Sequence, residues 1–240
     1  MIRATGLAKR FGRRDVLTGL DVAARAGHVT ALIGANGAGK TTLIKILLGL
    51  TRSDSGTISV DGRPLDGSPG YRAIIGYMPQ IARFPAHASG RDLLGILTTL
   101  RGAATPADLS LVEAFGLAEQ FERPLGVLSG GTRQKVNAVL AFAFQPRLLI
   151  LDEPTAGLDP LACRVLKDRI LAERAVGTTV LITSHVLPEL EELADDALCL
   201  DAGRAAWQGP VDQLKLQTAS TSLERAVAGM LRRTPEVLAR

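Results

Sequence analysis

The sequence predicts an α/β fold built on a mostly parallel sheet, with an antiparallel β part near the N-terminus and an inserted helical subdomain. Short apolar runs at 29–33, 148–151 and 179–183 are typical of buried strands, and a helical pattern at 160–175 lies between the last two. Strands and helices that alternate in this way favour a parallel sheet with helices on its faces. Apolar residues at helical spacing from 91 to 128 indicate the inserted subdomain.

The elements before that insertion follow from local signals. The strand at 29–33 enters a glycine-rich loop, and residues 40–50 then favour a helix that ends at Gly49–Leu50. Residues 57–60 alternate as a strand does, and Asp61–Gly62 is a strong hairpin turn. Residues 73–77 are a further strand candidate.

The later elements set the predicted domain limits. Within the helical lobe, Thr105–Pro106 is expected to start a helix and Gly116 to end one. Beyond Asp195, two short strands at 197–200 and 204–208 precede a helical tail around 223–231. These patterns predict one domain over 1–210, with the helical subdomain inserted at about 85–135, followed by a C-terminal helical tail over 211–240.

Composition excludes several classes of protein. The 240 residues carry a net charge of only +4, and the densest basic pairs, Arg13–Arg14 and Arg232–Arg233, are far apart. Nucleic-acid binding would need a clustered patch, so no nucleic-acid partner is expected. No apolar run approaches the ~20 residues needed to span a bilayer, and no secretion signal is evident. Cys163 and Cys199 have neither metal nor disulfide spacing, and we expect buried thiols in a reducing compartment.

A phosphate-binding pattern stands between the strand at 29–33 and the following helix. Its glycines let successive backbone N–H groups curl around a triphosphate, and the helix directs the positive end of its dipole at the phosphates. We expect Lys40 to reach the β and γ oxygens and Thr41 to offer its hydroxyl to Mg²⁺. The predicted nucleotide-binding residues are Gly34, Ala35, Asn36, Gly37, Ala38, Gly39, Lys40, Thr41 and Thr42.

Two carboxylates follow the apolar strand at 148–151. The carboxyl ends of parallel strands are where α/β sheets bind ligands. Asp152 is therefore a candidate Mg²⁺ ligand, and Glu153 is placed to orient and deprotonate an attacking water. The alternative is ordinary solvation of a strand end, which the phosphate-binding loop makes less attractive.

Further motifs give the chain a resemblance to the ATP-binding subunits of ABC transporters, which share the P-loop NTPase fold. Leu128 to Gln134 resembles the signature motif of that family and lies between the phosphate loop and the acidic pair. The resemblance implies ATP-site roles for Ser129, Gly130 and Gly131 (signature), Phe11 (adenine stacking), Gln80 (nucleotide and Mg²⁺), Asp159 (the D-loop) and His185 (γ-phosphate). Phe11 could instead be a core residue. His28 and His87 have no such match and are assigned to the surface or to packing.

The resemblance also implies how such a chain works. ATP and Mg²⁺ would lie between the phosphate loop of one subunit and the signature residues of a second, in a homodimer or a pair of ATPase subunits. An integral membrane permease would place the chain at the cytoplasmic face of the inner membrane. Ile81, Phe84 and Pro85 are candidates for contact with that permease, and ordinary packing is the alternative for these three residues. The segment 184–189 and the tail resemble a subgroup that serves drug and sodium exporters and the maturation of the copper enzyme nitrous oxide reductase.

Two rival functions follow from the same motifs. One is a soluble ABC ATPase that acts on DNA or ribosomes, although such proteins usually carry a long coiled-coil insertion or two tandem ATPase units. The other is a nucleotide-sensing module that does not hydrolyse ATP. The presence of both Glu153 and His185 argues against the second.

Overall fold

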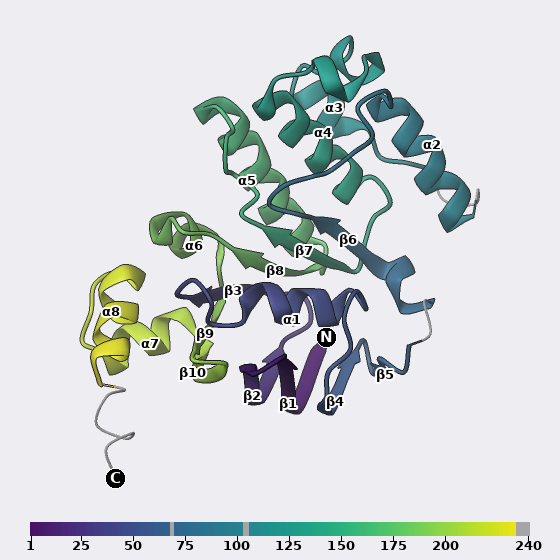
Figure 1. Ribbon diagram of the computed structural model, residues 1–240. Helices are drawn as coiled ribbons and strands as arrows, with labels where there is room; N and C mark the ends of the chain where they lie inside the picture. Colours follow the sequence, from purple (N-terminus) through teal and green to yellow (C-terminus); the bar gives the residue numbers. More distant parts are fainter. Residues whose placement is uncertain (68–69, 103–105, 234–240) are drawn as a thin grey trace. The chain divides into compact units, whose positions relative to one another are not determined.

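The computed structural model describes residues 1–67, 70–102 and 106–233, which form two compact units (Figure 1). The first unit contains Met1–Arg72 and Leu181–Arg240, and the second contains Ala73–Val180. The predicted limits of the inserted subdomain and of the tail stay predictions.

An antiparallel sheet begins the first unit. Its strands are β1 (Ile2–Phe11), β2 (Arg14–Ala24), β4 (Ser55–Val60) and β5 (Arg63–Pro64), in the order β2-β1-β4-β5. The predicted turn joins β4 to β5, with Val60 paired to Arg63. Asp61 and Gly62 adopt φ values of 53° and 74°, the left-handed pair that a two-residue hairpin requires. The predicted antiparallel part and its hairpin are therefore confirmed.

A second sheet region in the first unit joins segments that are distant in sequence. Strand β3 (Val29–Gly34) is parallel to β9 (Asp196–Asp201), and β10 (Arg204–Pro210) is antiparallel to β9. Helix α1 (Lys40–Leu47) follows β3 and ends three residues earlier than expected, because the chain turns at Gly49 with φ 66°. Every residue of β3 except Gly34 is buried, as its mainly apolar sequence predicts.

Three helices complete the first unit: α6 (Leu187–Leu193), α7 (Val211–Gln217) and α8 (Leu223–Arg233). Figure 1 shows α7 and α8 side by side, and α8 also contacts α6. Helices α7 and α8 both lie in the segment that the sequence predicted to be a helical tail, but α6 was missed. Helix α6 is only seven residues long, too short to display a helical period.

The second unit combines two parallel strands with helices. Strand β6 (Ile75–Met78) pairs with β7 (Leu148–Asp152), with Ile75 opposite Leu148. The helices are α2 (Gly90–Arg101), α3 (Ser110–Ala114), α4 (Gly130–Phe142) and α5 (Pro160–Ala175), with 3₁₀ turns at Gln120–Glu122 and Leu125–Val127. A further 3₁₀ turn, Gly70–Ile74, lies where the chain passes from the first unit into the second. Strand β8 (Thr179–Thr183) lies where the chain passes from the second unit back into the first. The predictions for α5 and β8 match the observed limits.

A helix was predicted to start at Thr105–Pro106, and for Pro106, which the structure describes, this prediction is wrong. Thr105 lies outside the described residues, residues 106–109 are not helical, and α3 begins at Ser110. The Asp108 backbone N–H donates to the Ala143 carbonyl, and its carboxylate accepts from the Ser110 N–H and from Arg169. These contacts keep the segment out of a helical conformation until Ser110. Gly116 follows the end of α3 with φ 63°, as expected.

The cysteines only partly match their prediction. Cys199 is buried in β9, and burial raises the pKa of its thiol to about 12. Cys163, on α5, is half-buried. Among the described residues, no helix combines the length and the apolar character that crossing a bilayer requires.

Candidate functional site

The loop between β3 and α1 is shaped by its glycines. Gly37 and Gly39 adopt φ values of 85° and 110°, which residues with a side chain rarely reach. A Cβ on Gly39 would lie 2.6 Å from the Leu17 side chain. The Ala38 N–H donates to the Ala35 carbonyl, which closes the loop into a tight turn. The backbone therefore has the compact curvature that surrounds a phosphate chain.

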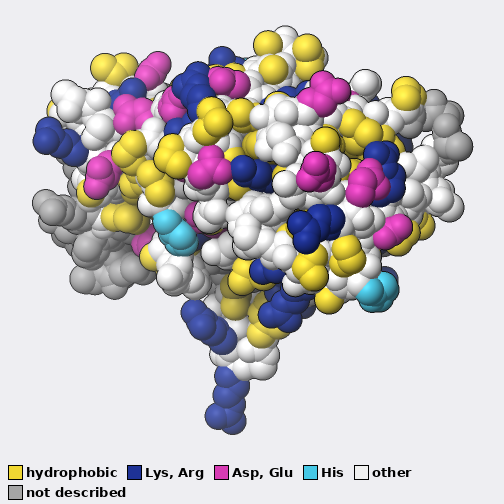
Figure 2. All heavy atoms as spheres, turned by 90° about the horizontal axis from the view of Figure 1, so that it is seen from above, with side chains coloured by type: hydrophobic (Ala, Val, Ile, Leu, Met, Phe, Trp, Pro, Cys, Tyr) yellow, Lys and Arg dark blue, Asp and Glu magenta, His cyan; other side chains and the backbone are white. Residues whose placement is uncertain are grey.

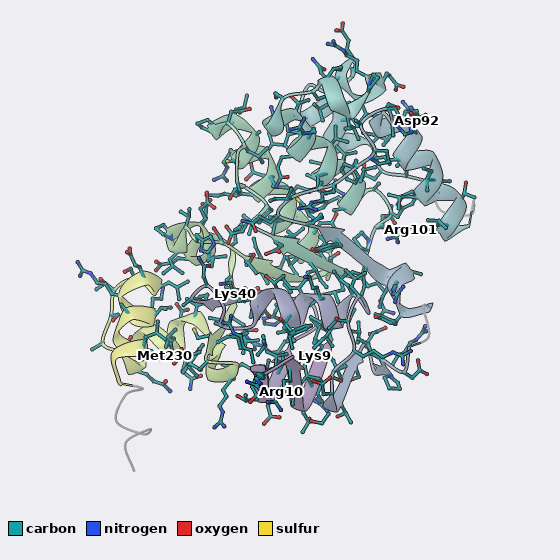
Figure 3. All side chains as sticks on the ribbon, in the orientation of Figure 1. Lys9, Arg10, Lys40, Asp92, Arg101 and Met230 are labelled. Carbon is teal, nitrogen blue, oxygen red and sulfur yellow. The ribbon has the colours of Figure 1, made fainter. Side chains whose placement is uncertain are left out.

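Charge at the start of α1 favours an anion. Helix α1 has no acidic residue in its first turn, so nothing there offsets the positive end of its dipole. The Lys40 ammonium lies beside the loop (Figure 3) and donates to the Gly34 carbonyl at 2.5 Å and to the Ala35 carbonyl at 3.3 Å. Thr41 is exposed and Thr42 is half-buried. The start of α1 therefore carries an ammonium group and two hydroxyl groups, all of which can donate hydrogen bonds to an anion.

His185 lies beside the phosphate loop. A cavity of about 220 Å³ is lined by Gly34 and Ala35 from the loop and by Ser184 and His185 from the segment after β8. The Ser184 hydroxyl accepts from the Val186 N–H at 3.0 Å, which fixes the turn that carries the exposed His185. The structure thus brings together two site elements that are about 150 positions apart in the sequence.

Phe11 ends β1 with half of its surface exposed (49%), which argues against the core alternative. The Lys9 ammonium lies 5.3 Å from its ring centroid, and Arg14 is its partner across the hairpin. A Cβ on Gly37 would lie 2.9 Å from the Arg14 guanidinium, so this cation lies against the phosphate loop. In the sequence Arg14 stands out only as part of a basic pair, and no local pattern places it at the site.

The two carboxylates after β7 differ in environment. Asp152 is half-buried. The pKa of Tyr77 is raised mainly by the burial of its own side chain and further by the negative charge of Asp152. Glu153 is only 8% exposed and adopts φ 52°, a backbone conformation that is uncommon for a residue with a long side chain. A non-glycine residue held in this region costs of order 1–3 kcal/mol and is frequent at functional sites. Glu153 is therefore not an ordinary solvated strand end.

The signature residues form the N-terminus of α4. Ser129 is the N-cap, and its hydroxyl accepts from the Thr132 N–H at 3.2 Å and shares a hydrogen bond with the Thr132 hydroxyl at 2.8 Å. Gly130 is exposed, and a Cβ there would meet no atom within 4 Å. Gly131 differs, because its Cβ would lie 2.8 Å from the Gly157 carbonyl oxygen. Only one of the two glycines is thus required by packing inside the chain.

Asp159 and Gln80 both belong to segments that are bonded to α4. Asp159 is the N-cap of α5, accepting from the Ala162 N–H at 2.8 Å, and it pairs with Lys135 of α4 at 2.8 Å. The hydrogen bond from Lys135 and then that from Ala162 lower the pKa of the Asp159 carboxyl. Gln80 is exposed, directly after Pro79, whose carbonyl accepts from Asn137.

The predicted site residues therefore fall into two groups. Those on the first unit are Phe11, Gly34 to Thr42 and His185; those on the second are Gln80, Ser129, Gly130, Gly131, Asp152, Glu153 and Asp159. His87 is exposed, in keeping with a surface role, whereas His28 is half-buried with its Nδ1 3.5 Å from Asp196, in keeping with packing.

The donor set suits a hard cation. Thr41 offers a hydroxyl, Asp152 a carboxylate and Gln80 an amide, all oxygen ligands of the kind that Mg²⁺ prefers. Mg²⁺ is usually held by one or two carboxylates together with substrate phosphates. The predicted residues fit that chemistry.

Sequence reasoning missed two groups near the site. Val227, Met230 and Leu231 of α8 supply the outer wall of the cavity beside His185. Gln134 and Asn137 are buried polar residues on α4. The only available signal was their polarity within a largely apolar helix, which does not reveal their partners.

A phosphate loop between a parallel strand and a helix, together with an acidic pair after another parallel strand, defines the class of P-loop nucleotide-binding proteins. The family described as "ABC transporter" matches residues 17–156, more than half of the chain. The daunorubicin resistance ATP-binding protein DrrA3 of Streptomyces coeruleorubidus is 37% identical over 229 residues, which cover 93% of this chain and 72% of that protein. The lantibiotic transport ATP-binding protein SrtF of Streptococcus pyogenes is 36% identical, covering 81% of this chain and 84% of that protein.

Solved structures agree with these relatives. One described as an ATP-binding subunit of an ABC transporter has a TM-score of 0.89 and 29% identity, covering 96% of this chain and 99% of that one. The dimeric cassette MJ0796 bound to ADP and Pi has a TM-score of 0.76 at 19% identity, covering 88% and 98%, and it supports the fold alone. The chain belongs to the ABC transporter family, as an ATP-binding subunit that hydrolyses ATP.

Proposed function

We propose that two copies of this chain, or this chain and a paired ATPase subunit, close on ATP so that the loop of Lys40 and the signature residues contact the same nucleotide from different subunits. The observation that carries this proposal is the open N-terminus of α4. Ser129 and Gly130 are exposed, no atom lies where a Gly130 Cβ would extend, and the first turn contains no acidic residue. Such a helix end attracts an anion supplied from outside its own unit.

Within that arrangement each residue has a distinct task. Glu153 accepts a proton from the water that attacks the γ-phosphate, while Lys40 neutralises charge on the β and γ oxygens. His185 and Ser129 hold the γ-phosphate, and Phe11 stacks on adenine. Mg²⁺, held by Thr41, Gln80 and Asp152, would neutralise the phosphates. Because both subunits contact the γ-phosphate, its loss releases the pair.

ATP hydrolysis by this chain would drive export through a separate membrane permease. The chain would lie at the cytoplasmic face of the inner membrane, bound to that permease. Relatives at 36–37% identity are described by drug resistance and lantibiotic transport, and the Nod factor export ATP-binding protein I of Burkholderia lata (strain ATCC 17760 / DSM 23089 / LMG 22485 / NCIMB 9086 / R18194 / 383) is 37% identical over 84% of this chain and 68% of its own. Ile81 is 71% exposed and Pro85 is exposed, which suits contact with a permease. A role in copper-enzyme maturation is the narrower form of this proposal.

The rival activity on DNA or ribosomes predicts a different partner. In Figure 2 acidic and basic side chains are interspersed across much of the visible face, which gives that rival no support there. Purification from membranes distinguishes the two: we expect an integral membrane protein to accompany the chain. Recovery of ribosomes or DNA without one would favour the rival.

Glu153→Gln tests the catalytic assignment. The variant keeps the shape of the side chain but cannot accept a proton at neutral pH, so we expect ATP binding without turnover and an ATP-dependent dimer in size-exclusion chromatography. Phosphate release measures turnover. Undiminished hydrolysis by Glu153→Gln would refute the assignment of the base, and a variant that stays monomeric with bound ATP would refute the paired site.

A further inference from the structure

Helix α4 carries two buried amides on one face. Gln134 is 7% exposed and Asn137 is 2% exposed, and they are three residues apart, the spacing that places side chains next to one another on a helix. The Asn137 amide donates to Gln134 Oε1 at 3.4 Å. Buried amides of this kind are costly unless their hydrogen bonds are made, so their partners are the informative feature.

Each amide is bonded to a segment of the candidate site. Gln134 Nε2 donates to the Pro154 carbonyl at 3.3 Å, and Pro154 directly follows Glu153. Asn137 Nδ2 donates to the Pro79 carbonyl at 3.0 Å, and Pro79 directly precedes Gln80. A proline has no backbone N–H, so its carbonyl is the only main-chain group by which either residue can be held.

Helix α4 also packs closely against other backbone segments near both of its ends. Near its start, the Gly157 carbonyl lies where a Gly131 side chain would extend, at 2.8 Å. Near its end, the Ala141 carbonyl occupies the place of a Gly76 side chain on β6. Such contacts between backbones leave little room for α4 to slide without moving the segments attached to it.

We propose that Gln134 and Asn137 are positioning residues that couple the phosphate-binding end of α4 to Glu153 and Gln80. A shift of α4 when Ser129 and Gly130 engage phosphate is passed through the two amides to the peptide after Glu153 and the peptide before Gln80. The φ of 52° at Glu153 gives the first bond a specific task, because that conformation persists only where its surroundings impose it. This inference rests on the proposed role of the signature residues.

Two variants of similar side-chain length test the coupling: Asn137→Leu and Gln134→Met. Each replaces a buried amide by an apolar side chain and leaves a proline carbonyl without its donor. Leucine is larger than asparagine, and the melting temperature reports the cost of that overpacking. The matched control is Thr178→Val, which removes the buried hydrogen bond of 2.8 Å from Thr178 to Glu173 in the same unit. Thr178 belongs to neither the site nor α4, so this control reports the loss of stability alone.

The measurements are the melting temperature, the Kd for ATP by titration, and kcat by phosphate release. We expect each test variant to lower kcat by about tenfold, equivalent to ~1.4 kcal/mol, with the Kd for ATP unchanged within about twofold because the loop of Lys40 is untouched. Thr178→Val should lower the melting temperature similarly and leave kcat unchanged. The proposal is overturned if kcat falls in proportion to melting temperature in all three variants, or falls in none.

A double-mutant cycle separates coupling from general damage. If Asn137 acts through Gln80, then Asn137→Leu combined with Gln80→Ala should reduce kcat less than the product of the separate effects. Multiplicative effects would overturn the assignment for Asn137. Absence of an ATP-dependent dimer in Glu153→Gln would instead count against the proposed paired site, and is recorded independently of these variants.

Discussion

Gly130 and Gly131 are adjacent in the signature segment, and the structure assigns them different reasons for being glycine. At Gly130 an added Cβ meets nothing within 4 Å, whereas at Gly131 it lies 2.8 Å from the Gly157 carbonyl oxygen. Both residues are in the first turn of α4, and neither has a positive φ. Alanine at the two positions therefore separates packing inside the chain from access for a ligand.

The magnitudes follow from that difference. Either substitution should gain roughly 0.4–1 kcal/mol, because alanine restricts the unfolded chain more than glycine does. Gly131→Ala must in addition displace a backbone carbonyl, and overpacking of this kind costs about 1–3 kcal/mol. The shared gain cancels when the variants are compared, so Gly131→Ala should be less stable than Gly130→Ala by ~1–3 kcal/mol. At about 2–4 °C per kcal/mol, the melting temperatures should differ by roughly 5 °C.

Thermal unfolding and phosphate release, measured on both variants, test the reasoning. Gly130→Ala should unfold at or above the wild-type temperature yet lose most of its ATPase activity, because its methyl group enters the approach to the γ-phosphate. Gly131→Ala should unfold at a lower temperature. Equal stabilities would show that the Gly157 carbonyl moves freely, and a fully active Gly130→Ala would show that no phosphate approaches α4 there.

Three further predictions concern charge and reactivity. Lys40→Ala should weaken ATP binding by roughly 10–100-fold, the worth of ~1.5–3 kcal/mol for charge-assisted hydrogen bonds, and an unchanged titration would contradict the phosphate loop. Lys135 and the Ala162 N–H lower the pKa of the Asp159 carboxyl in the folded state. The charged carboxylate therefore stabilises the fold at pH values above its unfolded pKa of ~4, and this stabilisation is lost as pH falls through the folded pKa. The melting temperatures of wild type and Asp159→Asn should converge in acid, and a constant difference would count against this ion pair. Because burial raises the thiol pKa of Cys199 to about 12, a thiol reagent at neutral pH should label only Cys163 in the folded protein; labelling of Cys199 before unfolding would refute this.

The sequence predicted the elements whose signals are local and strong. Strand β3 is a mainly apolar run, α5 begins with an Asp N-cap and a proline, and the hairpin at Asp61–Gly62 follows from residues that accept a positive φ. Helix α3 was misplaced because the bonds of Asp108 to Ala143 and Arg169 are tertiary and have no signature in the local sequence.

The residues of the candidate site could be predicted from the sequence, but the side chains that hold them in place could not. Glycines, Lys40 and the acidic pair mark the chemistry because phosphate binding needs those residue types in that order. The contacts of Gln134, Asn137 and Arg14 depend on segments that only folding brings together. The burial and positive φ of Glu153 are likewise properties of the folded backbone.

The wall that α8 gives to the cavity beside His185 bears on how fragments of this protein should be designed. Val227 and Met230 cover that side of the cavity (Figure 3 labels Met230). A chain that ends before Leu223 would expose Ile33 and Leu200 to water next to the phosphate loop. Exposed apolar surface promotes self-association of the protein. Helix α8 is therefore worth retaining in any shortened version, even though no phosphate-binding motif lies within it.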